Sequence, residues 1–241
     1  MNPFEKRENF RKILKVYGGS FLTATLVALA MKGFFFEIYR LPSGSMAPNF
    51  QAGDTLLASK LAYGFRFPGS TTPHFRKSKP SYGDVVVYAN PVEGGKEFIK
   101  RITGLPGDRV ELKNGEIYIN GKIITHLPPN KKVKGEEGRS STRCGTESPK
   151  PGVQYAVCAE DPYPENFGPE TLGPDHYFVV GDYRAKSVDQ RGGRNWASVP
   201  EYHIRARAKS IWISIEPLPS SGNGPSWFTR LRRDRFLKPV L

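Results

Sequence analysis

One run of alternating apolar and polar residues constrains the fold more than any other part of the sequence. Residues 97–124 read EFIKRITGLPGDRVELKNGEIYINGKII and contain two Asn-Gly pairs, Asn114-Gly115 and Asn120-Gly121. Asn-Gly between alternating segments is the strongest short-range signal of a β-hairpin, because both residues tolerate the positive φ angles that the tight turn needs. The chain also has 25 Gly and 21 Pro, which suits short strands joined by turns. The sequence therefore predicts a mainly β, antiparallel domain.

The apolar pattern divides this β region into two parts. We expect residues 39–126 and 175–216 to form the main β domain. Residues 127–174, between them, are rich in Pro, Gly, Ser, Lys and Glu, and their poor apolar periodicity predicts a loop-rich β insertion with little core. Residues 217–241 comprise a linker and a basic, aromatic tail. This tail is either disordered or in contact with a membrane interface.

The N-terminus joins a basic segment to an apolar one. Residues 1–15 are basic, and residues 16–38 form an apolar run that is interrupted by Lys32. A bilayer is crossed by about 20 apolar residues, and the basic flank places residues 1–15 in the cytoplasm. A cleavable signal peptide is the alternative, because Ala28–Ala30 has an A-x-A pattern. We expect an uncleaved single-pass anchor in the cytoplasmic (inner) membrane, with the β domain on the outer, periplasmic or extracellular side.

The formal charge of +13 indicates a negatively charged partner. No zinc-finger, basic-zipper or aromatic RNA-binding signature is present, so we expect anionic membrane lipids and no nucleic acid. The two cysteines, Cys144 and Cys158, both lie in the insertion and form no CxxC pattern. They are either unrelated thiols or, in an exported domain, a disulfide. We expect the disulfide.

No sequence motif identifies a histidine or a carboxylate as the partner of a nucleophilic serine. None of the four histidines lies in a G-x-S-x-G motif or has the spacing of a metal site, and the carboxylates form no obvious catalytic pair. A serine activated by a lysine remains. Lysine accepts a proton only when it is neutral, which requires burial, because burial lowers the pKa of an amine.

The strand pattern indicates which lysine is buried. Alternate residues of a strand share a face, so Lys100 lies between Phe98 and Ile102 on one apolar face. Arg101 lies on the opposite face, with Glu97 as a possible neighbour, and is a structural or solvated charge. Many strands bury only the stem of such a lysine and keep its amine in water. The pattern alone therefore makes Lys100 a candidate base without establishing it.

Four motifs then occur in order: PSGSM just after the apolar run, GDVVVY, FIKRITGLPGDRVE and GDYRAKSVDQR. Together they resemble the bacterial type I signal peptidases, which are membrane-bound Ser/Lys proteases. The resemblance covers residues 40–120 and 177–215. It implies a serine endopeptidase that removes signal peptides from exported preproteins through an acyl-enzyme, with no metal or other cofactor.

The resemblance also implies roles for individual residues. Ser45 matches the nucleophile, and Lys100, in the KR pair, matches the general base. Ser43 matches the serine whose hydroxyl contributes to the oxyanion hole together with the Ser45 N–H. The agreement on Lys100 is independent, because the strand pattern selected the same residue.

The last motif departs from the family pattern. Ser187 matches a serine that orients the lysine, and Asp189 and Arg191 match a supporting ion pair. The usual Asn-Arg-Asp-Asn-Ser is replaced here by YRAKS, so that Lys186 is an additional cation. After Arg191 the family's Tyr-Trp-Gly is replaced by GGRNW, which leaves the geometry of this segment open.

The expected substrate is a preprotein with small residues at the cut and two positions before it, bound as an extended strand. The protein-secretion machinery is a further expected partner. Two alternatives stay open for a sequence with this altered motif. One is a specialised paralogue that processes a single dedicated substrate, and the other is a catalytically degenerate module that binds signal peptides.

Overall fold

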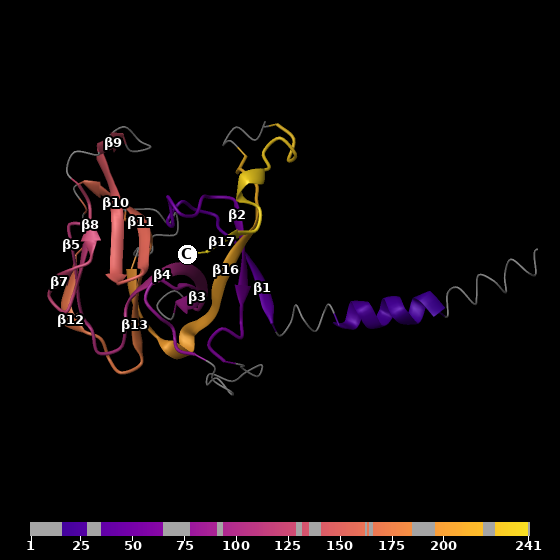
Figure 1. Cartoon of the computed structure of the whole chain (residues 1–241), viewed down its shortest axis with the longest axis horizontal. Coiled ribbons are helices and arrows are strands. Elements are labelled where there is room, and N and C mark those ends of the chain that lie inside the picture. Colours follow the sequence, from indigo (N-terminus) through magenta and orange to yellow (C-terminus); the bar gives the residue numbers. More distant parts are fainter. Residues whose placement is uncertain are drawn as a thin grey trace, which may run out of the picture.

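The structure is a computed structural model in which β-strands dominate (Figure 1). Nearly all strand pairs are antiparallel, which confirms the predicted mainly β fold. The described residues are 16–27, 35–64, 78–90, 94–128, 132–134, 141–161, 163, 166–184, 196–218 and 225–240.

The largest sheet has the order β1-β2-β16-β3-β4-β13-β15, and β17 also pairs with β16. It brings the N-terminal strands next to strands from the end of the chain, because β16 lies between β2 and β3. Its strands are β1 (Phe36–Arg40), β2 (Asp54–Ser59), β3 (Val85–Asn90), β4 (Lys96–Gly104), β13 (His176–Val180), β15 (Trp196–Pro200), β16 (Ile204–Ser214) and β17 (Lys238–Pro239).

The second sheet has the order β12-β5-β6-β7. The predicted Asn-Gly turns connect β5 to β6 and β6 to β7, and Asn114 and Asn120 have φ angles of 52° and 53°. Both hairpin predictions are thus confirmed. The strands are β5 (Arg109–Lys113), β6 (Glu116–Ile119), β7 (Lys122–Ile123) and β12 (Phe167–Thr171).

The third sheet has the order β14-β11-β10-β8, with β9 paired to β10, and lies in the same half of the molecule as the second sheet (Figure 1). It contains the long hairpin β10–β11, in which Cys144 and Cys158 face each other and form a disulfide. The strands are β8 (Thr125–His126), β9 (Lys132–Lys134), β10 (Ser141–Lys150), β11 (Val153–Asp161) and β14 (Tyr183–Arg184).

The insertion is more regular than its composition predicts. Tyr155, Val157 and Ala159 alternate along β11 and are buried together with Leu127 in a core cluster of their own. The expectation of little core in residues 127–174 was therefore wrong. In the sequence, the Pro, Gly, Ser and Lys residues of β10 obscured the period-two alternation of buried apolar residues in β11.

Strand β13 connects the main sheet to the second sheet. Tyr177 and Val179 belong to the core cluster of the main sheet, whereas Phe178 and Val180 pack with β5 and β6. Because successive side chains of a strand point to opposite faces, this strand is buried on both sides. The run HYFVV is apolar for that reason.

The first described segment, residues 16–27, is a helix. Nowhere in the ranges given above does a helix combine the length and the apolar character that crossing a membrane would require. The expected anchor, 16–38, also overlaps β1, because Phe36 and Ile38 pair with Ser59 and Leu57 of β2. The alternating sequence FEIYR explains why the chain is already a strand at this point.

Residues 225–240 form what we call the C-terminal strap. It contains a short 3₁₀ turn, η2 (Arg233–Arg235), and β17, which pairs with β16. Val240 packs against a core cluster that includes Leu41, Met46 and Phe50. The disordered alternative for the tail therefore does not hold for these residues. A second 3₁₀ turn, η1 (Glu201–His203), precedes β16.

Candidate active site

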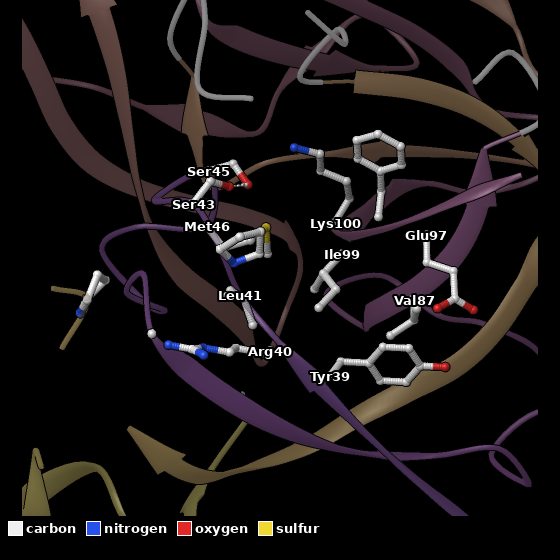
Figure 2. A pocket seen from close by; sticks show the side chains of 14 residues that line it. Tyr39, Arg40, Leu41, Ser43, Ser45, Met46, Val87, Glu97, Ile99 and Lys100 are labelled. Atoms are coloured by element: carbon white, nitrogen blue, oxygen red, sulfur yellow. Dashed lines mark hydrogen bonds between the residues drawn. The ribbon is translucent and has the colours of Figure 1, made fainter. Parts of the chain in front are cut away.

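A cavity of about 570 Å³ lies between β1, the loop after it, and β4 (Figure 2). It brings together Ser43, Ser45 and Lys100, three of the residues that the sequence singled out. Its lining consists of Tyr39, Arg40, Leu41, Pro42, Ser43, Ser45, Met46, Gly53, Val87, Glu97, Phe98, Ile99, Lys100 and Pro217.

The loop of residues 41–53, which we call the Ser45 loop, joins β1 to β2. Two backbone hydrogen bonds close its base, from Leu41 N to Asp54 O (2.8 Å) and from Gly53 N to Leu41 O (2.9 Å). Met46 and Phe50 anchor it in the core and are exposed by only 0% and 3%. The loop is therefore held in a fixed position, and its polar residues lie at the edge of the cavity.

Ser45 is held from two directions. Its side chain is nearly buried, and the Ser43 hydroxyl donates a 3.4 Å hydrogen bond to the Ser45 hydroxyl. Its carbonyl accepts a 3.1 Å hydrogen bond from the N–H of Tyr183. The two serines of PSGSM therefore lie side by side at one end of the cavity.

Lys100 lies on β4 and is 2% exposed, with Phe98 and Ile102 buried on the same strand. The predicted burial of this lysine is thus confirmed. Figure 2 shows the Lys100 amine pointing toward the hydroxyls of Ser43 and Ser45. A buried amine directed at a serine hydroxyl is the arrangement that proton transfer between them requires.

Arg101 points to the other face of β4 and is 1% exposed, so it is a structural and not a solvated charge. Its guanidinium donates to both carboxylate oxygens of Asp182, at 2.8 Å and 2.7 Å, and to Gly83 O at 2.8 Å. Burial opposes its charge, but the Asp182 carboxylate outweighs burial and raises the pKa of Arg101. The acidic partner is Asp182 and not the suggested Glu97, which lines the cavity.

Sequence reasoning missed the role of Asp182. The residue stands in the GDYR motif, but its partner lies 81 positions earlier in the chain. The GDYR motif indicated that Asp182 has a role. No spacing in the sequence predicts which cationic side chain pairs with it. Its carboxylate is 1% exposed, so a buried partner is required.

Tyr155 connects the first ion pair to a second buried ion pair, Arg184 with Glu147. Arg184 also donates to Gly115 O at 2.9 Å, and Glu147 accepts hydrogen bonds from Thr125 (2.8 Å) and Tyr155 (2.6 Å). The ring of Tyr155 also lies under the Arg101 guanidinium, 4.1 Å from its centre. Burial, reinforced by the Glu147 carboxylate, raises the pKa of Tyr155 well above its usual value.

Other residues singled out from the sequence lie elsewhere. Ser187, Asp189 and Arg191, with Lys186, fall in 185–195, outside the described residues. None of the described histidines, at positions 126, 176 and 203, lines the cavity. Within the described part of the chain, no group of three or more His, Cys, Asp or Glu side chains could hold a metal ion.

The sequence is similar to known proteins over most of its length. The family model described as "Signal peptidase, peptidase S26" matches residues 14–213. Signal peptidase I of Pseudomonas aeruginosa is 31% identical over 230 residues, covering 91% of this chain and 79% of that protein. Signal peptidase I of Rickettsia conorii is 30% identical over 232 residues, covering 90% and 86%.

Among solved structures, a signal peptidase I from Enterococcus faecalis V583 is a weak match. It has a TM-score of 0.32 and 19% identity, and it covers 54% of this chain and 97% of that chain. The family assignment therefore depends on the sequence matches, which extend over most of the chain and agree with each other. The chain belongs to the peptidase S26 family of signal peptidases.

Proposed function

We propose that this protein is a membrane-anchored serine endopeptidase that removes signal peptides from exported preproteins by means of a Ser45/Lys100 dyad. The observation that carries the proposal is the buried Lys100 amine, which points toward the Ser45 hydroxyl inside a cavity. Family membership supports the reaction class, a signal peptidase type protease.

The proposed reaction begins with a neutral Lys100, because burial disfavours the ammonium form. Lys100 accepts the Ser45 proton as the Ser45 oxygen attacks the scissile carbonyl. It then gives this proton to the leaving amine, which breaks the peptide bond and leaves an acyl-enzyme. Finally Lys100 takes a proton from water, the hydroxide cleaves the ester, and the proton returns to Ser45.

The oxyanion is proposed to bind to the Ser43 hydroxyl and the Ser45 N–H. The 3.4 Å contact between the two serine hydroxyls supports this, because a group bonded to the Ser45 oxygen would lie beside Ser43. A donor of this kind typically contributes about 3 kcal/mol to the stability of the transition state.

The substrate is proposed to bind as an extended strand along the cavity. In such a strand, side chains two residues apart point to the same side. The cavity continues from Ser45 past Ile99 toward Val87 and Tyr39 (Figure 2). The residue at the cut and the one two positions before it would both face this lining, which suits small side chains.

Three further residues complete the proposed site on the evidence of the family motif alone. We assign Ser187 the role of orienting the Lys100 amine. Asp189 and Arg191 are assigned to a supporting ion pair beside it.

The protein is proposed to sit in the cytoplasmic membrane, with residues 1–15 in the cytoplasm and the β domain on the outer side. The apolar, basic-flanked N-terminal sequence supports this topology. Two exposed aromatic side chains also lie together, Trp212 on β16 and Phe236 in the strap, with 6.0 Å between their ring centroids. With the basic residues of the strap, they would suit anionic lipid headgroups. The secretion machinery would deliver the substrate there.

The test is the cleavage of one purified preprotein by the full-length protein in detergent. We expect the wild type to cleave it, Ser45→Ala and Lys100→Met to abolish cleavage, and His176→Ala to retain it. The rate should rise with pH as Lys100 loses its proton. Cleavage of the preprotein by Lys100→Met would contradict the proposed Ser45/Lys100 dyad.

A second measurement separates an enzyme from a binding module. A mechanism-based acylating inhibitor should label Ser45 in the wild type and leave Ser45→Ala unlabelled. Cleavage of several unrelated preproteins would distinguish a general signal peptidase from a paralogue with one dedicated substrate.

A further inference from the structure

Asn49 makes contacts that the proposed mechanism does not use. It lies four residues after Ser45 and is half-buried. Its side-chain Nδ2 donates to Ala156 O on β11 and to Asp182 Oδ2, both at 2.7 Å. An amide group has two N–H donors, so both are occupied. This side chain ties the Ser45 loop to segments 107 and 133 positions away along the chain.

Asp182 connects this attachment to the strand of the proposed base. Its Oδ2 accepts from Asn49, and both of its carboxylate oxygens accept from Arg101, the neighbour of Lys100 on β4. Asp182 and Arg101 are each 1% exposed, so water does not compete for these bonds. One carboxylate therefore holds the loop of the proposed nucleophile and the strand of the proposed base together.

The segment from Ser45 to Asn49 is fastened at both ends by two consecutive residues. Tyr183 N–H donates to Ser45 O at 3.1 Å, and the Asp182 carboxylate accepts from Asn49 at 2.7 Å. Within the segment's turn, Phe50 N–H donates to Met46 O at 2.9 Å. Two attachments fix the rotation of the segment as well as its position, and this rotation determines where the Ser45 hydroxyl points.

The C-terminal strap fixes the backbone of the same residue. Arg235 Nη2 donates to Asn49 O at 3.0 Å, and the same guanidinium binds the Asp54 carboxylate at 3.0 Å and 2.6 Å. Arg235 is 6% exposed and Asp54 is fully buried. Asn49 is thus the junction of β11, the turn at Asp182 and the strap.

From this junction we infer that Asn49 is a positioning residue that sets the Ser45 hydroxyl at proton-transfer distance from Lys100. The inference rests on the proposed function, because it concerns the same serine and lysine. Asn49 does not line the cavity in which the substrate is proposed to bind. It acts through Asp182 and through the peptide segment that carries Ser45.

The test compares Asn49→Ala with the wild type, full-length and in detergent, on one preprotein. The substitution removes both side-chain donors and keeps the carbonyl that Arg235 binds. We expect kcat to fall about 10- to 100-fold, because small displacements of reacting groups cost that much. KM should stay within about twofold, because the residues lining the cavity are unchanged. The rate of Ser45 acylation by the inhibitor should fall by the same factor as kcat.

Asn120→Ala is the matched control. Asn120 Nδ2 likewise donates to an acidic side chain, Asp108, at 3.0 Å, but it lies in the turn between β6 and β7, away from the cavity. Its loss should lower stability and leave kcat unchanged. Asn49→Ser supplies one donor in place of two, and it is the variant to use if Asn49→Ala does not fold. Its kcat should lie between those of Asn49→Ala and the wild type.

The outcomes separate the two proposals. An inactive wild type would overturn the proposed function. An active wild type with Asn49 variants that match the kcat of Asn120→Ala, per folded molecule, would overturn only the inference. A rise in KM with unchanged kcat would also overturn it, since Asn49 would then act on substrate binding.

Discussion

Two buried ion pairs of the same chemistry hold different regions of this molecule. At the site, Arg101 pairs with Asp182, and both are 1% exposed. Further along, Arg184 of β14 pairs with Glu147 of the insertion, and both are 0% exposed. Tyr155 lies between them, with its ring under Arg101 and its hydroxyl on Glu147. The two pairs form one continuous buried polar network that connects β4 to the insertion.

The difference lies in what each pair touches. Asp182 also accepts from Asn49 in the Ser45 loop, whereas Glu147 also accepts from Thr125 on β8. Removing charges from water costs several kcal/mol, so buried pairs contribute little net stability but are expensive to break. Their main effect is to dictate which segments meet. The first pair joins the loop of the proposed nucleophile to the strand of the proposed base, and the second joins the insertion to β14.

The largest effect is expected when the first pair is broken. Arg101→Met leaves the Asp182 carboxylate buried and uncompensated, which should cost about 3–5 kcal/mol of unfolding free energy. The remaining folded molecules should also have a lower kcat, because Asp182 no longer holds β4 against the Ser45 loop. Urea unfolding and turnover per folded molecule measure the two effects. A stability loss below about 1 kcal/mol would show that the pair does not organise this region.

Breaking the second pair should isolate stability from turnover. Arg184→Met leaves Glu147 unpaired and should also cost about 3–5 kcal/mol. Here the folded molecules should retain the wild-type kcat, because the hydrogen bonds of Arg184 and Glu147 to the described residues go to Gly115, Thr125, Tyr155 and each other, and not to the Ser45 loop. The same two measurements apply. Equal losses of kcat in both arginine variants would remove the distinction between the two regions.

The contrast also shows what the sequence reveals. The two Asn-Gly hairpins and the burial of Lys100 were predictable, because they depend on local alternation and turn chemistry. The alternation identifies a face of β4, and a lysine between Phe98 and Ile102 on that face has little access to water. The family motifs then added roles for Ser43 and Ser45, which line the same cavity as Lys100.

The connections between distant segments were not predictable. Arg235 meets Asp54 across 181 positions and Asn49 meets Asp182 across 133. The periodicity of the sequence does not predict such pairs, because they depend on how the sheets pack around the site. A local pattern was also overlooked, because the polar composition of β10 obscured the alternation of Tyr155, Val157 and Ala159 in β11.

A smaller effect is expected from the disulfide of the insertion. Cys144 and Cys158 are separated by 14 positions, and a crosslink closing a loop of about 15 residues contributes about 3 kcal/mol in the chain-entropy model. The double variant Cys144→Ser/Cys158→Ser should lose up to this amount in urea unfolding. Its turnover at 25 °C should stay at the wild-type level, because the ion pairs remain. A loss of kcat in the folded double variant would show that the β10–β11 hairpin also influences catalysis.

The smallest effect tests the residue between the two regions. Tyr155→Phe keeps the ring under Arg101 and removes the hydroxyl bound to Glu147. A hydrogen bond to a charged group contributes about 1.5–3 kcal/mol, and the loss should be near the lower limit because Arg184 and Thr125 still bind Glu147. We expect kcat to be unchanged at neutral pH. A variant that loses turnover would show that the Tyr155 hydroxyl transmits the state of the insertion to the site.

The same variant has an expected pH signature. Burial, and then the Glu147 carboxylate, raises the pKa of Tyr155 in the folded protein, so above pH 10 the unfolded chain releases this proton first. Wild-type stability must therefore fall as the pH rises past 10, and Tyr155→Phe lacks this contribution to the fall. The stability gap between the two proteins should narrow by about 1 kcal/mol between pH 10 and pH 11. Urea unfolding at pH 8, 10 and 11 measures it, and a gap that stays constant would mean that Tyr155 ionises as easily in the folded protein as in the unfolded chain.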